Sequence, residues 1–131
     1  MSKTVLLILL VLVSTDLSAE WVKINTKDNL TTYVDPASIT KAENIAKMWG
    51  LVDLKESKKE ELGKSFLSAK GLQEYDCKEQ QIRKITLSFY SGNMGDGEVV
   101  HSYAEPEKWK WTPVAHGTIS ETMWKAACGK K

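Results

Sequence analysis

The sequence has no large excess of positive or negative charge. Its 131 residues carry 18 Lys and Arg against 17 Asp and Glu, a formal net charge of +1. Proteins that bind nucleic acid usually present a strongly basic patch, and attachment to anionic lipid needs clusters of Lys and Arg. The composition therefore favours neither nucleic acid nor a charged lipid surface as a partner.

Catalytic signatures are missing as well. The sequence has no GxSxG or HExxH motif and no Gly-rich loop between a strand and a helix. Glu74 and Asp76 flank Tyr75 on one face of a predicted strand and could mimic a carboxylate pair, but a solvated strand face explains them. His101 lies among apolar neighbours and could ligate haem or metal, although such a residue more often sits at the edge of a core. We expect no enzyme, no cofactor and no metal.

Long apolar runs are limited to one, the nine residues Val5–Val13. A membrane-spanning helix needs about 20 such residues. With Lys3 before the run and Ala19 closing it, the pattern predicts a secretory signal peptide over 1–19. No cysteine stands near the junction, so we expect no lipid anchor. The remaining residues, 20–131, are expected to form a single domain that is exported to the periplasm, the cell surface or the medium.

Cysteine is scarce, with two residues in the whole chain. In an exported protein, Cys77 and Cys128 predict one disulfide, with two unpaired thiols as the alternative. The cysteines and histidines show no CxxC or HxxxH spacing, which disfavours a metal site. A bond between Cys77 and Cys128 closes a loop whose chain-entropy contribution is roughly 4 kcal/mol.

The clearest pattern that is present covers residues 74–92, EYDCKEQQIRKITLSFYSG. It predicts the end of one strand, a tight turn and a complete second strand. From 83 to 89, apolar and polar residues alternate, which is typical of a strand with one buried and one wet face. The expected buried residues are Ile85, Leu87 and Phe89, and the expected wet ones are Lys84, Thr86 and Ser88.

Two shorter strands are predicted at 20–25 and 30–34, joined by turn-forming residues at 26–29. Asp35-Pro36 is expected to end the second of them. The residues that follow fit either one helical turn or a bend into a short strand, and we favour the bend.

Further along, 44–54 is apolar at both parities, which predicts a strand covered on both faces. The charged run 55–64 predicts a solvated loop. Residues 65–77 are expected to be extended, with Gly71 marking a bulge or a close backbone approach. Another strand is expected at 98–104.

One helix is predicted, beginning after Thr118. Thr118 and Glu121 form a capping box, and Gly129 suits the residue just beyond the helix end. The helix has an apolar stripe that consists of Ile119, Met123 and Ala127. This stripe is expected to pack against a sheet. The predicted class is α+β: a mainly antiparallel sheet of about six strands, with one C-terminal helix packed on it and tethered by a disulfide.

Two loops are the expected contact surfaces, because loops on a rigid sheet carry recognition more often than strands do. One is the Gly-rich turn 91–97 and the other is 109–117, WKWTPVAHG. Aromatic residues anchor interfaces, and among the five tryptophans Trp109 or Trp111 is expected to be exposed. The predicted partner-binding residues are Trp109, Trp111, Asn93 and Met94.

Several segments together resemble the surface-adhesin protein E family of bacterial exported domains. They are EWVKI at 20–24, YVDPASI at 33–39, KGLQEYDC at 70–77, IRKITLSFYSGNMGDGEVV at 82–100, and WKAAC at 124–128. The resemblance implies a mainly antiparallel sheet with a C-terminal helix tethered by a cysteine pair. The family is named for a lipid-anchored adhesin that engages host extracellular-matrix proteins, so it also implies a protein partner of that type.

Two functions follow as hypotheses. The first is a non-catalytic binding domain that recognises a protein partner at the cell envelope or outside the cell. The alternative is a structural envelope protein that forms homodimers or larger assemblies through an exposed sheet edge.

Overall fold

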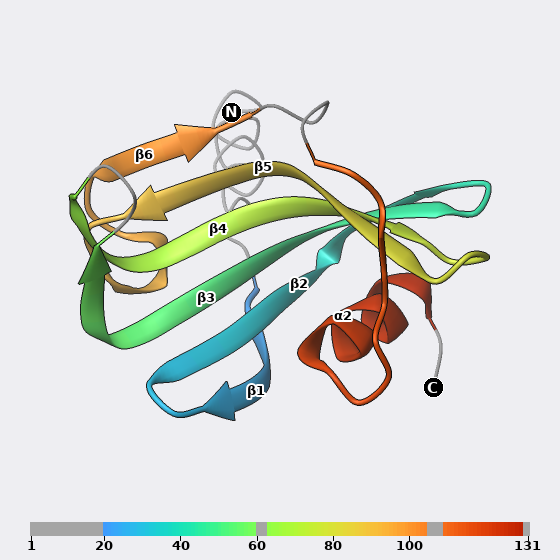
Figure 1. The fold of residues 1–131 in the computed structure, drawn as a ribbon, viewed down its shortest axis with the longest axis horizontal. Helices are drawn as coiled ribbons and strands as arrows, with labels where there is room; N and C mark the ends of the chain where they lie inside the picture. The colour runs from blue at the N-terminus through green and yellow to red at the C-terminus, as the bar shows by residue number, and fades with distance from the viewer. Residues whose placement is uncertain (1–19, 60–62, 105–108, 130–131) are drawn as a thin grey trace, which may run out of the picture.

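The computed structural model describes residues 20–59, 63–104 and 109–129. Six strands form an antiparallel sheet in chain order, and a seventh short strand pairs with the start of the fifth (Figure 1). The elements are β1 Val22–Lys27, β2 Leu30–Ala42, β3 Ile45–Lys59, β4 Ser65–Asp76, β5 Gln81–Tyr90, the 3-10 turn η1 Asn93–Gly95, β6 Val99–Tyr103, β7 Thr112–Pro113 and α2 Ile119–Cys128. The predicted α+β class is confirmed.

The β4–β5 hairpin is as expected, with the Asp76 carboxylate accepting backbone N–H bonds from Lys78 and Glu79 in the turn. Its predicted alternation is partly wrong. Gln73 on β4 pairs with Lys84 on β5, whereas the preceding β4 residue, Leu72, pairs with Thr86. One extra residue is therefore inserted in β5 at this point. Such a bulge shifts the side-chain alternation by one position. Lys84, expected on the wet face, therefore shares a face with Leu87, which pairs with Gly71.

Two predicted strand ends are also wrong. Asp35-Pro36 does not end β2: the pairing with β3 is interrupted between Asp35 and Thr40 and then resumes to Ala42. The bend is fixed locally, because the Asp35 carboxylate accepts the Ala37 N–H and the Asp35 carbonyl accepts the Ser38 hydroxyl. The expected loop 55–64 is strand as far as Lys59, which pairs with β4, and its residues 60–62 lie outside the described part.

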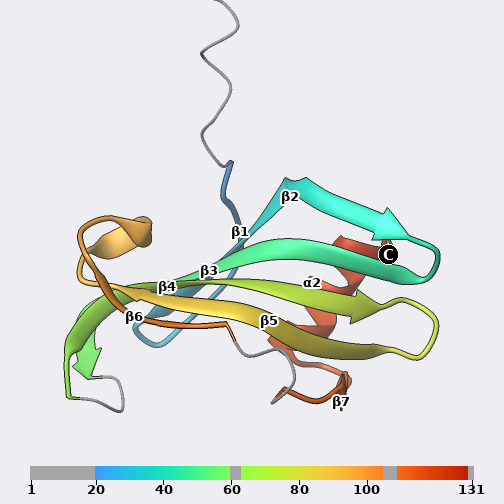
Figure 2. The same cartoon turned by 90° about the horizontal axis from the view of Figure 1, so that it is seen from above.

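The core lies on one face of the sheet, beneath α2 (Figure 2), and we call this the helix face. The opposite side is called the outer face. The buried core residues are Val34, Ala46, Met48, Tyr75, Trp124, Ala127 and Cys128. The Trp124 indole N–H donates to the Asp76 carbonyl at 2.8 Å. The predicted disulfide is confirmed: Cys77 and Cys128 are bonded, with their Cα atoms 5.6 Å apart, which ties the end of α2 to the end of β4.

Both ends of α2 are capped. The Thr118 side chain accepts the Glu121 N–H, as the capping box predicts, but the Glu121 carboxylate accepts the N–H of Gly117 rather than that of Thr118. Gly129 has the left-handed conformation expected beyond a helix end (φ 70°). No helix in the described ranges is long and apolar enough to cross a membrane.

Candidate functional site: a glycine-floored groove on the helix face

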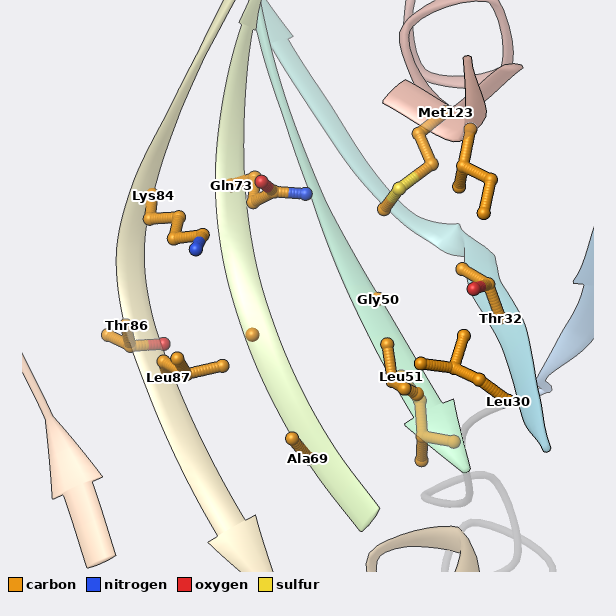
Figure 3. A pocket seen from close by; sticks show the side chains of 13 residues that line it. Leu30, Thr32, Gly50, Leu51, Ala69, Gln73, Lys84, Thr86, Leu87 and Met123 are labelled. Atoms are coloured by element: carbon orange, nitrogen blue, oxygen red, sulfur yellow. The ribbon is translucent and has the colours of Figure 1, made fainter. Parts of the chain in front are cut away.

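The helix covers one end of its face of the sheet and leaves the rest open. A helix of 10 residues is about 15 Å long, whereas the 15 residues of β3 extend for about 50 Å. A groove of about 340 Å³ lies where the cover ends, between α2 and the open half of the sheet (Figure 3). It is lined by Leu30, Thr32, Gly50, Leu51, Val52, Ala69, Gly71, Gln73, Lys84, Thr86, Leu87, Ile119 and Met123.

Small residues make the floor of this groove. Gly50 and Gly71 pair directly across β3 and β4, and Ala69 follows on the same face of β4. A Cβ on Gly71 would lie 3.1 Å from the backbone oxygen of Thr86, so the predicted close backbone approach is confirmed. A Cβ on Gly50 would lie 3.1 Å from the terminal methyl of Met123, which overhangs from α2 (Figure 3). Larger residues at either position would fill the groove.

Gln73 and Lys84 pair across β4 and β5 at one end of the groove, whereas Thr86 and Thr32 line other parts of it (Figure 3). Gln73 is fixed there, because its amide donates to the Tyr75 hydroxyl at 2.9 Å. Burial raises the pKa of Tyr75 well above its usual range, so this phenol stays protonated. Lys84 has no hydrogen-bond or ion-pair partner within the described ranges. The Thr86 hydroxyl oxygen is buried and likewise has no partner there.

A second depression of about 340 Å³ continues past this polar end and shares Gln73 and Lys84 with the groove. The segment before β7 contributes Trp109 and Lys110 to its lining. The combined surface is thus apolar beside Met123 and basic where Lys84 and Lys110 lie.

Trp111 holds this segment against the sheet. The Arg83 guanidinium lies 4.9 Å from the centre of the Trp111 ring and forms an ion pair with Glu74. Glu74 is therefore engaged in a structural ion pair, and the Asp76 carboxylate is engaged in the hairpin turn. The carboxylate pair considered from the sequence is accounted for by these contacts.

Asn93 and Met94, the other predicted contact residues, lie at the far end of the sheet. The Asn93 amide donates to the Leu54 carbonyl at 2.8 Å, and the Met94 N–H donates to the Asp53 carboxylate at 2.7 Å. β7 pairs at the start of β5, whereas η1 follows its end, about 30 Å away for a strand of this length. The two predicted loops do not form one surface, and η1 is anchored by its own polar groups.

The expectation about tryptophan exposure is wrong. Trp49 is the exposed tryptophan, at 37%, while Trp109 and Trp111 are half-buried. His101 packs its ring against Tyr103, with centroids 4.3 Å apart. The described ranges contain no group of three or more His, Cys, Asp or Glu residues placed to hold a metal ion.

Comparison with solved structures defines the class of fold first. Crystal form II of Haemophilus influenzae protein E superposes with a TM-score of 0.66 at 16% sequence identity, covering 88% of this chain and 91% of that one. A further H. influenzae protein E structure gives a TM-score of 0.58 at 20% identity, with 89% and 92% covered. The protein thus has the protein E fold.

Sequence comparison then gives the family. Residues 21–129 match the profile of the family described as surface-adhesin protein E, and the chain belongs to that family. No curated protein matches the chain.

Proposed function

We propose that this protein is an exported, non-catalytic domain that recognises a protein partner through the groove on its helix face. The observation that carries the proposal is the groove itself: an apolar, glycine-floored depression that α2 leaves open. Binding pockets are characteristically apolar with a few placed polar groups. Membership of a surface-adhesin family supports a partner outside the cytoplasm.

The lining indicates the chemistry of the partner. Apolar side chains suit the end beside Met123, and an acidic side chain suits the end where Lys84 and Lys110 lie. We therefore infer that the partner presents a segment with apolar anchors next to a carboxylate. Host extracellular-matrix proteins are the first panel to test, because the family is named for adhesion.

Export rests on the apolar run at 5–13 and on Ala19, which lie outside the described residues. The expected mature protein begins near Glu20 and carries no lipid. Intact-mass measurement of protein purified from its native host tests this. A mature species that retains Val5–Val13 would contradict export by signal cleavage.

Binding is tested by filling the groove. Ala69→Phe places a ring over the floor, and Lys84→Glu reverses the charge at the polar end. Each should weaken partner binding at least about tenfold, because central, desolvated contacts dominate interfaces. Trp109→Ala should weaken binding more than it lowers the melting temperature. Trp49→Ala, on the outer face, is the matched control and should bind as the wild type does. Equal binding by wild type and Ala69→Phe would refute the groove as the site.

Self-association is the second candidate, and the sheet edges favour it. β1 and β6 stand at the two ends of the strand order, and each exposes a valine: Val22 at 47% and Val99 at 55%. Unpaired edges template pairing with another chain. Analytical ultracentrifugation would show a dimer that Val99→Lys dissociates if this edge is used. A monomer at all concentrations would exclude it.

A further inference from the structure

A second depression, on the outer face, is built differently from the groove. It has a volume of about 240 Å³ and is lined by Trp21, Asp35, Trp49, Lys70, Ser88 and Tyr90. Three of these six residues are aromatic, in a chain whose aromatic content is 8%. Trp49, the exposed tryptophan, is among them. Three aromatic rings thus line one hollow that the solvent reaches.

Strand pairing brings these residues together. Asp35 on β2 pairs with Trp49 on β3, and Lys70 on β4 pairs with Ser88 on β5. The Lys70 ammonium lies 4.9 Å from the centre of the Tyr90 ring, a cation–π contact that limits its freedom. The floor of the depression is therefore a paired sheet, and its charged group has a defined position.

Asp35 supplies a buried acceptor. Its side chain belongs to a residue that is only 7% exposed, and its Oδ1 accepts the Ala37 N–H at 3.2 Å. No hydrogen bond to Oδ2 is formed within the described residues, and Oδ2 is not a fully buried atom. A lining carboxylate with one oxygen that makes no hydrogen bond within the described residues can accept a bond from a ligand hydroxyl.

We propose that this depression binds a neutral hexopyranose ring of a glycan. The C–H faces of a pyranose are flat and apolar enough to lie against tryptophan and tyrosine rings, while its hydroxyls both donate and accept hydrogen bonds. The Asp35 carboxylate can accept a hydrogen bond from a sugar hydroxyl, and the Lys70 ammonium can donate to the ring and hydroxyl oxygens. The Ser88 hydroxyl shares a hydrogen bond with the Ser102 hydroxyl at 2.9 Å. The negative charge of the Asp35 carboxylate balances the positive charge of the Lys70 ammonium. The depression therefore favours a neutral sugar over a uronic acid.

The experiment uses titration calorimetry of the purified protein with the methyl glycosides of glucose, galactose and mannose, and with glucuronate as the acidic comparison. At least one neutral glycoside should bind in the millimolar range, more tightly than glucuronate. Trp49→Ala and Asp35→Asn should each weaken that binding about tenfold or more. Asp35→Asn keeps an oxygen for the Ala37 N–H, so its fold should be preserved if Trp49→Ala is unstable.

The matched control is Trp109→Ala, which removes a tryptophan from the other face and should bind the glycoside as the wild type does. Failure of all three neutral glycosides to bind, preference for glucuronate, or unchanged binding by Asp35→Asn would each overturn the proposal. Partner binding in the groove would be untouched by any of these results, because the two depressions share no lining residue.

Discussion

Removing the disulfide should destabilise this protein by an amount that its topology sets. Cys77 and Cys128 are separated by 51 positions, and the chain-entropy relation gives about 4 kcal/mol for a loop of that length. The variant Cys77→Ala/Cys128→Ala avoids leaving a lone thiol. Because small domains have total stabilities of about 5–15 kcal/mol, the double variant should still fold, but with a much smaller margin.

Urea denaturation measures the effect. With an m-value of about 1–3 kcal/mol/M, the midpoint should fall by about 1.3–4 M, and reduced wild-type protein should behave like the variant. Hydrogen exchange should show the α2 amides losing protection first, since two hydrogen bonds then remain as side-chain ties between α2 and the sheet. The Trp124 indole donates to the Asp76 carbonyl, and the Lys41 ammonium donates to the Cys128 carbonyl. A loss below about 1 kcal/mol, or equal loss of protection in β3 and α2, would refute this reasoning.

Two further predictions concern the groove floor and the helix cap. Gly71→Ala should cost about 1–3 kcal/mol in thermal unfolding, because its Cβ meets the backbone oxygen of Thr86. Gly50→Ala should cost clearly less, because its Cβ meets a flexible methyl, and an equal cost would contradict this packing. The Gly117 N–H holds the pKa of Glu121 below its ordinary value. The resulting stabilisation is present above about pH 4.3 and is lost as the pH falls below it. The free energies of unfolding of wild type and Glu121→Gln, measured at several pH values, should differ less in acid. A difference that is independent of pH would exclude the Glu121 carboxylate as the source of the stabilisation.

The parts of the fold that short-range patterns specify could be predicted. Alternation located the β4–β5 hairpin, the Thr118 cap located the start of α2, and the cysteine count gave the disulfide. The bulge in β5 was missed because no glycine or proline marks it, and a bulge depends on the partner strand. Continuation of β2 through Asp35-Pro36 was missed because proline is tolerated where pairing is interrupted.

The groove could not be predicted, because it depends on strand register. Gly50 and Gly71 are far apart in sequence, and nothing in either neighbourhood shows that they pair. The exposure of Trp49 was missed for a related reason. Residues 44–54 are apolar at both parities, which predicted two covered faces, yet α2 covers one face and the outer face carries Trp49 partly in solvent.

Site-specific photo-crosslinking tests the central claim most directly. A photoreactive phenylalanine analogue is placed at Leu87, which lines the groove, or at Val99, which lies exposed on the β6 edge. The protein is then irradiated in cultures of its native host, and the products are identified by mass spectrometry. Recognition in the groove predicts a crosslink from position 87 to a different protein, lost when Ala69→Phe is added. Crosslinks from position 99 to a second copy of this chain, with none from position 87, would contradict it.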